Sequence, residues 1–223
     1  MKAELITYPD RELLALSLAD RIAQELRQNL SAQGRASLCV PGGSTPQPVF
    51  ESLASLELDW PNVTVFLNDE RWVPRTHPRS NSAMLRKHLF QGPAAAAQYL
   101  DLFTGDPTPE GAAPALSEQI APHLPITVLI LGMGNDMHTA SLFPGAAGLE
   151  ALMANDAAPV MAASGGGEPR ITLTRPALRS ALFGHLLILG EEKLRALEEA
   201  EGKDPLEAPI AGFLSDLTVH YAE

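Results

Sequence analysis

The sequence predicts an α/β protein whose largely parallel sheet is covered by helices on both faces. Short apolar runs typical of buried strands occur at residues 37–40, 63–67, 126–131 and 185–189. Stretches with helical spacing of apolar residues separate these runs, and each run is followed by glycine, proline or a polar residue. The 223 residues show no internal repeat and no sharp shift in composition, so we expect residues 1–223 to form a single domain.

The first half of the chain alternates helix and strand. Asp10 is a good N-cap for a long amphipathic helix that ends near Gly34, and the strand at 37–40 follows. A second helix is predicted to begin at Pro46, before the strand at 63–67. Ser80 is predicted to cap a third helix, which continues to about residue 90.

The second half has a less regular pattern. Residues 91–114 are rich in Pro, Gly and Ala, and we expect a loop with one short strand at 99–103. Residues 157–169 contain three consecutive glycines and are predicted to form a flexible connection, open to movement as a loop. The remaining helices are predicted at 115–121, near Thr139, and at 149–153, 176–183, 194–200 and 208–214. The remaining strands are predicted at 126–131, 170–174 and 185–189, with an edge strand at 218–221.

The composition limits the compartment and the class of partner. A formal net charge of −11 argues against non-specific nucleic-acid binding, which needs a basic surface. No apolar run has the length of a membrane span, and the first residues lack the apolar core of a signal peptide, so we expect a cytoplasmic protein. The single cysteine, Cys39, excludes an intramolecular disulfide and is expected to pack as a small hydrophobe.

Positive charge is concentrated in one segment of this acidic chain. Residues 72–100 contain no Asp or Glu, carry four Arg or Lys residues and directly follow Arg71. Such a segment suits a small anionic ligand better than a polyanion. A solvated basic helix face would give the same pattern, and the charges alone do not decide between the two.

A glycine-rich turn follows the strand at 37–40, in the segment Pro-Gly-Gly-Ser-Thr-Pro at 41–46. Gly42 and Gly43 would let backbone N–H groups approach a ligand, and Ser44 or Thr45 could cap the next helix or donate a hydrogen bond. The N-terminus of that helix would favour an anion, so the segment is a candidate phosphate site. A turn and cap that serve only the fold remain the alternative.

The most informative stretch is the strand at 126–131 with the loop after it, which delivers Asp136 and His138. In open α/β sheets, ligands bind beyond the carboxyl ends of the strands, so a carboxylate and an imidazole there are in a plausible catalytic position. The alternatives are a structural or surface histidine and an aspartate that caps a helix. A second polar cluster, from Asn68 to Arg71, follows the strand at 63–67.

Four stretches in this order and spacing resemble the 6-phosphogluconolactonases of the pentose phosphate pathway. They are PGGSTP at 41–46, NDERWVP at 68–74 with Ser80-Asn81, GMGNDMHTASLFPG at 132–145, and RITLT at 170–174 followed by Gly190 and Lys193. The resemblance covers nearly the whole chain and extends more distantly to the glucosamine-6-phosphate deaminases. It implies a Rossmann-like three-layer α/β/α fold, no metal and no organic cofactor. The implied substrate is a small-molecule phosphosugar lactone, 6-phosphoglucono-δ-lactone.

The resemblance also implies roles for individual residues. His138 matches the catalytic base, which would take a proton from the attacking water and return it to the departing ring oxygen. As a hypothesis of our own for the mechanism, Asp136 orients the imidazole or favours its charged form, and Arg71 or the backbone of the 132–134 turn stabilises the oxyanion. The resemblance implies Gly42, Gly43, Ser44 and Thr45 as phosphate-binding residues, with Lys193 as the charged partner of the phosphate. Arg71 and Arg170 are further candidates for contact with an anion, and Asp69 corresponds to a polar position in the pocket.

One departure from the family pattern lies next to the base, where Met137 stands in place of the glycine of Asp-Gly-His. If that position needs a positive φ, methionine is strained there by about 1–3 kcal/mol. Two other functions fit the same scaffold: deamination or isomerisation of an amino-sugar phosphate through Asp69 and His138, and non-catalytic sensing of a sugar phosphate. The sequence leaves open whether the protein is a monomer or a homodimer.

Overall fold

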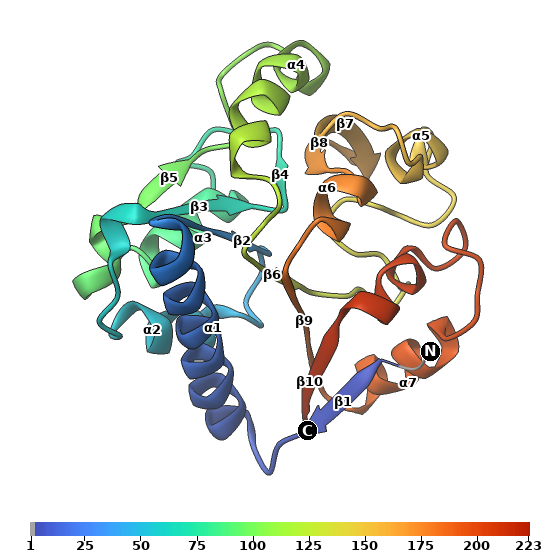
Figure 1. Ribbon diagram of the computed structural model, residues 1–223. Helices are drawn as coiled ribbons and strands as arrows, with labels where there is room; N and C mark the ends of the chain where they lie inside the picture. The colour runs from blue at the N-terminus through green and yellow to red at the C-terminus, as the bar shows by residue number, and fades with distance from the viewer. Residues whose placement is uncertain (1–2) are drawn as a thin grey trace.

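The computed structural model describes residues 3–223, and within them a seven-stranded sheet forms the centre of the molecule (Figure 1). Every pair of neighbouring strands in this sheet runs parallel. In spatial order the strands are β1 (Glu4–Thr7), β10 (Thr218–Ala222), β9 (Phe183–Leu189), β6 (Val128–Leu131), β2 (Ala36–Val40), β3 (Val63–Leu67) and β5 (Gln98–Leu100). The predicted α/β class with a largely parallel sheet is confirmed.

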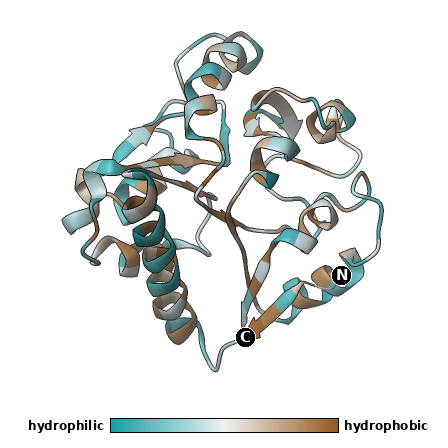
Figure 2. Cartoon of the chain, in the orientation of Figure 1, coloured by the Kyte–Doolittle hydropathy of each residue, from teal (hydrophilic) through white to brown (hydrophobic). Residues whose placement is uncertain are grey.

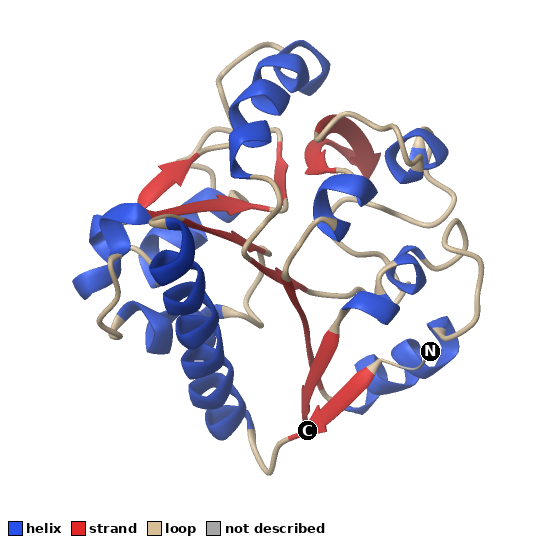
Figure 3. Cartoon of the chain, in the orientation of Figure 1, coloured by secondary structure: helices blue, strands red, loops and turns tan. Residues whose placement is uncertain are grey.

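Helices cover the sheet on both sides, as Figures 1 and 3 show, with α1 and α2 on one face and α7 on the other. The helices are α1 (Arg11–Gln33), α2 (Gln47–Ala54), α3 (Asn81–His88), α4 (Pro109–Ile120), α5 (Leu149–Met153), α6 (Arg175–Arg179) and α7 (Glu191–Ala200). The caps of α1 are those predicted: the Asp10 side chain accepts a hydrogen bond from the Leu13 N–H, and Gly34 ends the helix at φ 71°. Ser80 caps α3 in the same way, through the Ala83 N–H.

A second, antiparallel sheet of three strands was not predicted. It consists of β4 (Asp69–Arg71), β8 (Glu168–Leu173) and β7 (Val160–Gly165), in that order. The prediction of a flexible connection at 157–169 is wrong, because most of that segment belongs to the β7–β8 hairpin. Its two-residue turn, Gly166-Gly167, has φ values of 62° and 79°, the geometry that matches the twist of paired strands.

Other sequence predictions also need correction. The helix expected at 115–121 begins earlier, at Pro109, because Thr108 caps it by accepting a hydrogen bond from Gly111 N–H. The strand at 218–221 is β10 and lies inside the sheet, while the edge is formed by β1, which was not predicted. The last predicted helix, at 208–214, is two 3₁₀ turns, Pro209–Gly212 and Leu214–Asp216.

The core lies along the central strands, which are the most hydrophobic part of the chain in Figure 2. All residues of β2, β3 and β6 are buried, Cys39 among them, as predicted. The chain runs from β2 outward to β3 and β5, then returns to β6 and continues the other way to β9 and β10. The order therefore reverses between β2 and β6, and in such sheets the ligand crevice lies beyond the carboxyl ends of these strands. Within residues 3–223, none of the helices could cross a bilayer.

Candidate active site

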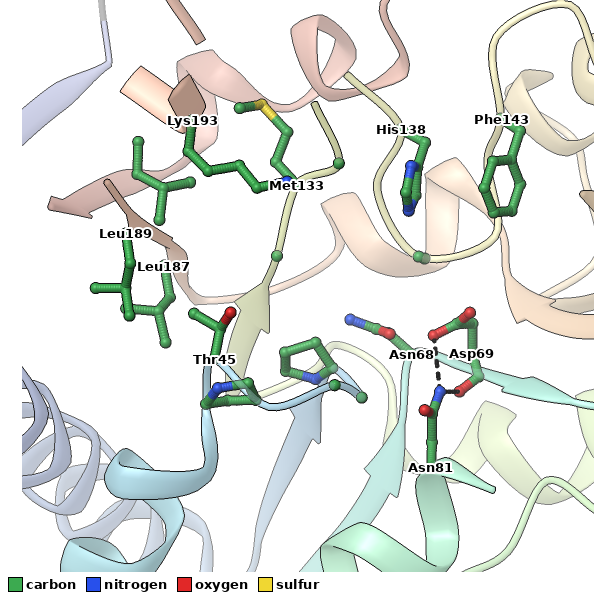
Figure 4. Close-up of a pocket in the computed structure, with 18 of the residues that line it drawn as sticks. Thr45, Asn68, Asp69, Asn81, Met133, His138, Phe143, Leu187, Leu189 and Lys193 are labelled. Carbon is green, nitrogen blue, oxygen red and sulfur yellow. Dashed lines mark hydrogen bonds between the residues drawn. The ribbon is translucent and has the colours of Figure 1, made fainter. Parts of the chain in front are cut away.

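A cavity of about 350 Å³ opens where the loops after β2 and β6 diverge (Figure 4). The loop after β2, the cluster after β3, the loop after β6 and the start of α7 all contribute to its wall. Its lining includes Gly42, Gly43, Thr45, Asn68, Asp69, Arg71, Asn81, Gly134, His138, Phe143, Arg170 and Lys193. The switch point of the sheet therefore gathers side chains from segments more than 100 residues apart.

The imidazole of His138 is fixed by Asp136 at one ring nitrogen. Nδ1 lies 2.5 Å from Asp136 Oδ1, and the same oxygen accepts a longer bond from the His138 backbone N–H. Burial by itself would raise the pKa of Asp136, but the hydrogen bonds and charge of His138 outweigh it and the pKa is lowered. Among the described residues Nε2 has no hydrogen-bond partner, and Figure 4 shows the ring pointing into the cavity.

The loop that carries this pair is tightly wound. Gly134 leaves no space for a side chain, since a Cβ there would lie 2.1 Å from His138 Nδ1, and its N–H donates to the His138 carbonyl. Met137 and Ala140 have positive φ values, 66° and 48°. Position 137 thus has the left-handed backbone for which glycine is preferred, and the condition for strain at Met137 is met. These turns also explain why the helix predicted near Thr139 does not form.

A buried polar cluster lies on the other side of the cavity. Ser141 Oγ donates to Asp69 Oδ2 at 2.5 Å, and Arg170 Nη1 lies 3.4 Å from both groups. Arg170 also donates to the Gly165 carbonyl and to Glu168. The serine hydroxyl is therefore held by a carboxylate and has no adjacent histidine base among the described residues, which disfavours a nucleophilic role.

Glu70 and Asn81 organise the wall between these groups, and sequence reasoning assigned a role to neither. The fully buried Glu70 carboxylate accepts hydrogen bonds from Ser80 Oγ and from the backbone N–H groups of Arg71, Asn81 and Ser82. Burial raises the pKa of Glu70, and these four bonds oppose the rise. The Asn81 amide donates to the Asp69 carbonyl and accepts from Arg71 Nη1. It also fills the space that a side chain at Gly42 would need.

The glycine loop and Lys193 form the opposite wall (Figure 4). Neither Ser44 nor Thr45 caps α2, whose N-cap is Pro46 without a side-chain hydrogen bond. Thr45 lines the cavity, whereas Ser44 lines a neighbouring hollow beside Arg11. Burial lowers the pKa of Lys193, and the charges of Asp136 and Glu192 partly oppose this.

The structure brings most of the predicted site residues to one cavity. Gly42, Gly43, Thr45, Asp69, Arg71, His138, Arg170 and Lys193 line it, and Asp136 stands behind the imidazole. Ser44 is the exception. Asn68, Asn81 and Phe143 also line it, and only the motifs in which they stand gave a signal for them in the sequence. Among the described residues no cluster of His, Cys, Asp and Glu is arranged to hold a metal ion.

Comparison with known proteins identifies the family of this chain. The family model described as glucosamine-6-phosphate isomerases/6-phosphogluconolactonase matches residues 9–220. The chain belongs to this family.

Members of the family with the name 6-phosphogluconolactonase are similar over nearly the full length. The chain is 42% identical to that of Pseudomonas putida, with 93% of this chain and 87% of the relative covered. It is 40% identical to that of Rhizobium meliloti strain 1021, with both chains covered completely. The crystal structure of a 6-phosphogluconolactonase from Shewanella baltica OS155 superposes with a TM-score of 0.96 at 33% identity, covering 100% of this chain and 98% of that one.

Proposed function

We propose that this chain is a 6-phosphogluconolactonase, which hydrolyses 6-phosphoglucono-δ-lactone to 6-phosphogluconate. The observation that carries the proposal is the His138 imidazole, which Asp136 fixes at Nδ1 and whose Nε2, unbonded by any residue of 3–223, faces a cavity of about 350 Å³. A base with one nitrogen held and one free is what proton transfer to and from a reacting group requires. Family members that are 42% and 40% identical over nearly the full length carry the name of this activity.

In the proposed reaction, Nε2 takes a proton from water as the water oxygen attacks the lactone carbonyl carbon. The tetrahedral oxyanion then collapses, the bond from carbon to the ring oxygen breaks, and protonated His138 returns its proton to that oxygen. Asp136 accepts the Nδ1 hydrogen, which selects the tautomer with a basic Nε2 and stabilises the imidazolium. A base of this kind contributes about 10²–10⁴-fold to the rate.

Two further groups are proposed to stabilise the negative charges of the oxyanion and of the substrate phosphate. Gly134 N–H is committed to the His138 carbonyl, and Arg71 Nη1 donates to Asn81 and to the Arg79 carbonyl. The remaining guanidinium N–H groups of Arg71, at the cavity wall, are the proposed donors to the oxyanion. The loop at Gly42 and Gly43, with Thr45 and Lys193, is proposed to hold the phosphate. Binding the phosphate away from the reacting carbon would fix the lactone for attack.

The whole chain, residues 1–223, is proposed to act as one catalytic domain in the cytoplasm. Its proposed partner is a small phosphosugar lactone, bound in the cavity of about 350 Å³, and the net charge of −11 argues against a nucleic acid as the partner.

The test is the hydrolysis rate of freshly generated 6-phosphogluconolactone, corrected for spontaneous opening, in the wild type and in His138→Asn. We expect a fast wild type and a variant slower by about 10²–10⁴-fold. His88→Asn is the matched control, because His88 Nδ1 also contacts a carboxylate, Glu51, at 2.6 Å but does not line the cavity. Equal rates in wild type and His138→Asn would remove the base from the proposal.

Two substrates distinguish a lactonase from an amino-sugar-phosphate deaminase with the same fold. A wild type that does not accelerate lactone opening but releases ammonia from glucosamine 6-phosphate would be a deaminase. Gluconolactone without its phosphate should be a much poorer substrate than the phosphorylated lactone. Equal efficiency on the two lactones would remove the phosphate site.

A further inference from the structure

The His138 ring is held by a second contact that the reaction scheme above does not use. The ring of Phe143 stacks on the imidazole with centroids 4.3 Å apart and planes inclined by 25° (Figure 4). Asp136 fixes one edge of the imidazole, but a single hydrogen bond leaves the ring free to tilt about it. A stacked ring restricts that tilt, so the two contacts together set the direction of Nε2.

Phe143 is itself held by the tip of the β7–β8 hairpin. A Cβ on Gly165 would lie 2.0 Å from Phe143 Cδ2 and 2.6 Å from its Cγ, so the ring occupies the space of a side chain at that position. The Arg170 guanidinium lies over the same ring, 5.2 Å from its centroid. Arg170 is in turn fixed by the Gly165 carbonyl and by Glu168.

We propose that Phe143 is a positioning residue for His138, and that the hairpin tip at Gly165 and Arg170 acts on the base through it. The proposal rests on the function proposed above. Packed groups transmit a displacement because interiors are close-packed, so a shift of Phe143 moves the imidazole face that leans on it. A misplacement of about 1 Å at a reacting group can cost about 10²-fold in rate.

The test combines Phe143→Leu and Gly165→Ala, singly and together, with kcat and KM measured separately. Phe143→Leu should lower kcat by about 10- to 100-fold and leave KM near that of the wild type, because the phosphate contacts are untouched. Gly165→Ala should also lower kcat, since the new methyl group displaces the ring. With Leu at 143 there is no stacked ring for the methyl group at residue 165 to displace, so the double variant should have the kcat of Phe143→Leu alone.

Gly167→Ala is the matched control. Gly167 has φ 79° and no heavy atom within 4 Å of an added Cβ, so this change strains the hairpin turn without touching Phe143. It should lower the melting temperature and leave kcat unchanged. A loss of kcat in Gly167→Ala equal to that in Gly165→Ala would mean that hairpin integrity, and not the ring, is what matters.

Proton NMR of the His138 ring supplies a measurement independent of turnover. The ring current of Phe143 should shift the Cε1 proton of His138 in the wild type, and this shift should vanish in Phe143→Leu and change in Gly165→Ala. An unperturbed kcat in Phe143→Leu, or losses that simply multiply in the double variant, would overturn the proposal. If the wild type itself does not hydrolyse the lactone, the proposed function fails, and the NMR shift still decides whether the hairpin sets the ring.

Discussion

Two histidine–carboxylate pairs lie toward opposite ends of the same parallel sheet. His138 contacts Asp136 at 2.5 Å on the loop after β6, beyond the carboxyl ends of the strands. His185 contacts Glu25 at 2.7 Å near the start of β9, at the other end. The contact is of the same kind in both pairs, so the contact alone does not mark a catalytic histidine.

The pairs differ in what happens to the second ring nitrogen. His185 Nδ1 lies 3.1 Å from His220 Nε2, and His220 Nδ1 lies 2.8 Å from the Tyr8 hydroxyl, so both nitrogens of each ring are used. The His185 side chain is 1% exposed, whereas that of His138 is 30% exposed and its Nε2 is free among the described residues. A histidine can serve as a base where one nitrogen is held and the other faces a cavity; with both held, it serves the fold.

The largest effects are expected when the carboxylate of each pair is replaced by its amide. Asp136→Asn should lower kcat by about 10²–10⁴-fold with little change in stability, because an amide no longer selects the tautomer with a basic Nε2. Glu25→Gln should leave kcat unchanged and lower the unfolding free energy by about 1–3 kcal/mol, since buried polar groups lose a charged partner. The measurements are kcat and urea unfolding of both variants. The comparison breaks if Glu25→Gln is the variant that loses activity.

The cations beside the two pairs should behave differently as well. Lys193 makes no ion pair within 4.0 Å among the described residues, while Arg21 Nε contacts Glu25 at 3.2 Å. Lys193→Met should raise KM for the phosphorylated lactone by about 10- to 100-fold, the usual worth of a hydrogen bond to a charged group. Arg21→Met is the control and should leave KM as it is. A Lys193→Met variant with normal KM and low kcat would place the lysine at the reacting carbon instead of the phosphate.

His220, which contacts the buried His185, should make stability depend on pH. Burial, and then the neighbouring His185 and Arg21, lower the pKa of His220 from 6.5 to about 3. Between these values the unfolded chain binds more protons than the folded one, so the unfolding free energy falls as the pH falls below about 6.5. One such group contributes a slope of up to about 1.4 kcal/mol per pH unit. Urea unfolding of the wild type and His220→Gln between pH 6.5 and 4.5 should show a flatter profile in the variant, and parallel profiles would refute the assignment to His220.

The framework of this fold could be predicted because its causes are local. Buried strands are apolar runs, and helices such as α1 begin and end at side-chain and glycine caps. The β7–β8 hairpin could not be predicted from the sequence, because β7 is built from Val, Met, Ala, Ser and Gly and has no clear apolar pattern. This strand is stabilised by pairing with β8 and by packing against α4. Strand stability of that kind depends on neighbours distant in sequence.

The site residues also fall into those that could be predicted from the sequence and those that could not. Asp136 and His138 were predictable, since a loop after a central strand lies at the switch point whatever the details. Phe143 was not, because its role depends on the hairpin that the sequence did not reveal. Met137 lies between these cases: its departure from glycine was visible in the sequence, and only the structure shows that the backbone there has φ 66°.

The smallest expected effect is a difference in stability that arises from the backbone conformation next to the two pairs. His185 and His220 lie in regular strands, whereas His138 follows Met137, whose positive φ is unfavourable for any residue with a Cβ. Met137→Gly should therefore be more stable than Met137→Ala by about 1 kcal/mol, since both variants remove the methionine contacts and only glycine relieves the strain. Melting temperatures and urea midpoints of the two variants measure this difference. If Met137→Ala proved the more stable, the left-handed backbone at 137 would carry no strain, and the loop that carries His138 would be as relaxed as the strands that hold the buried pair.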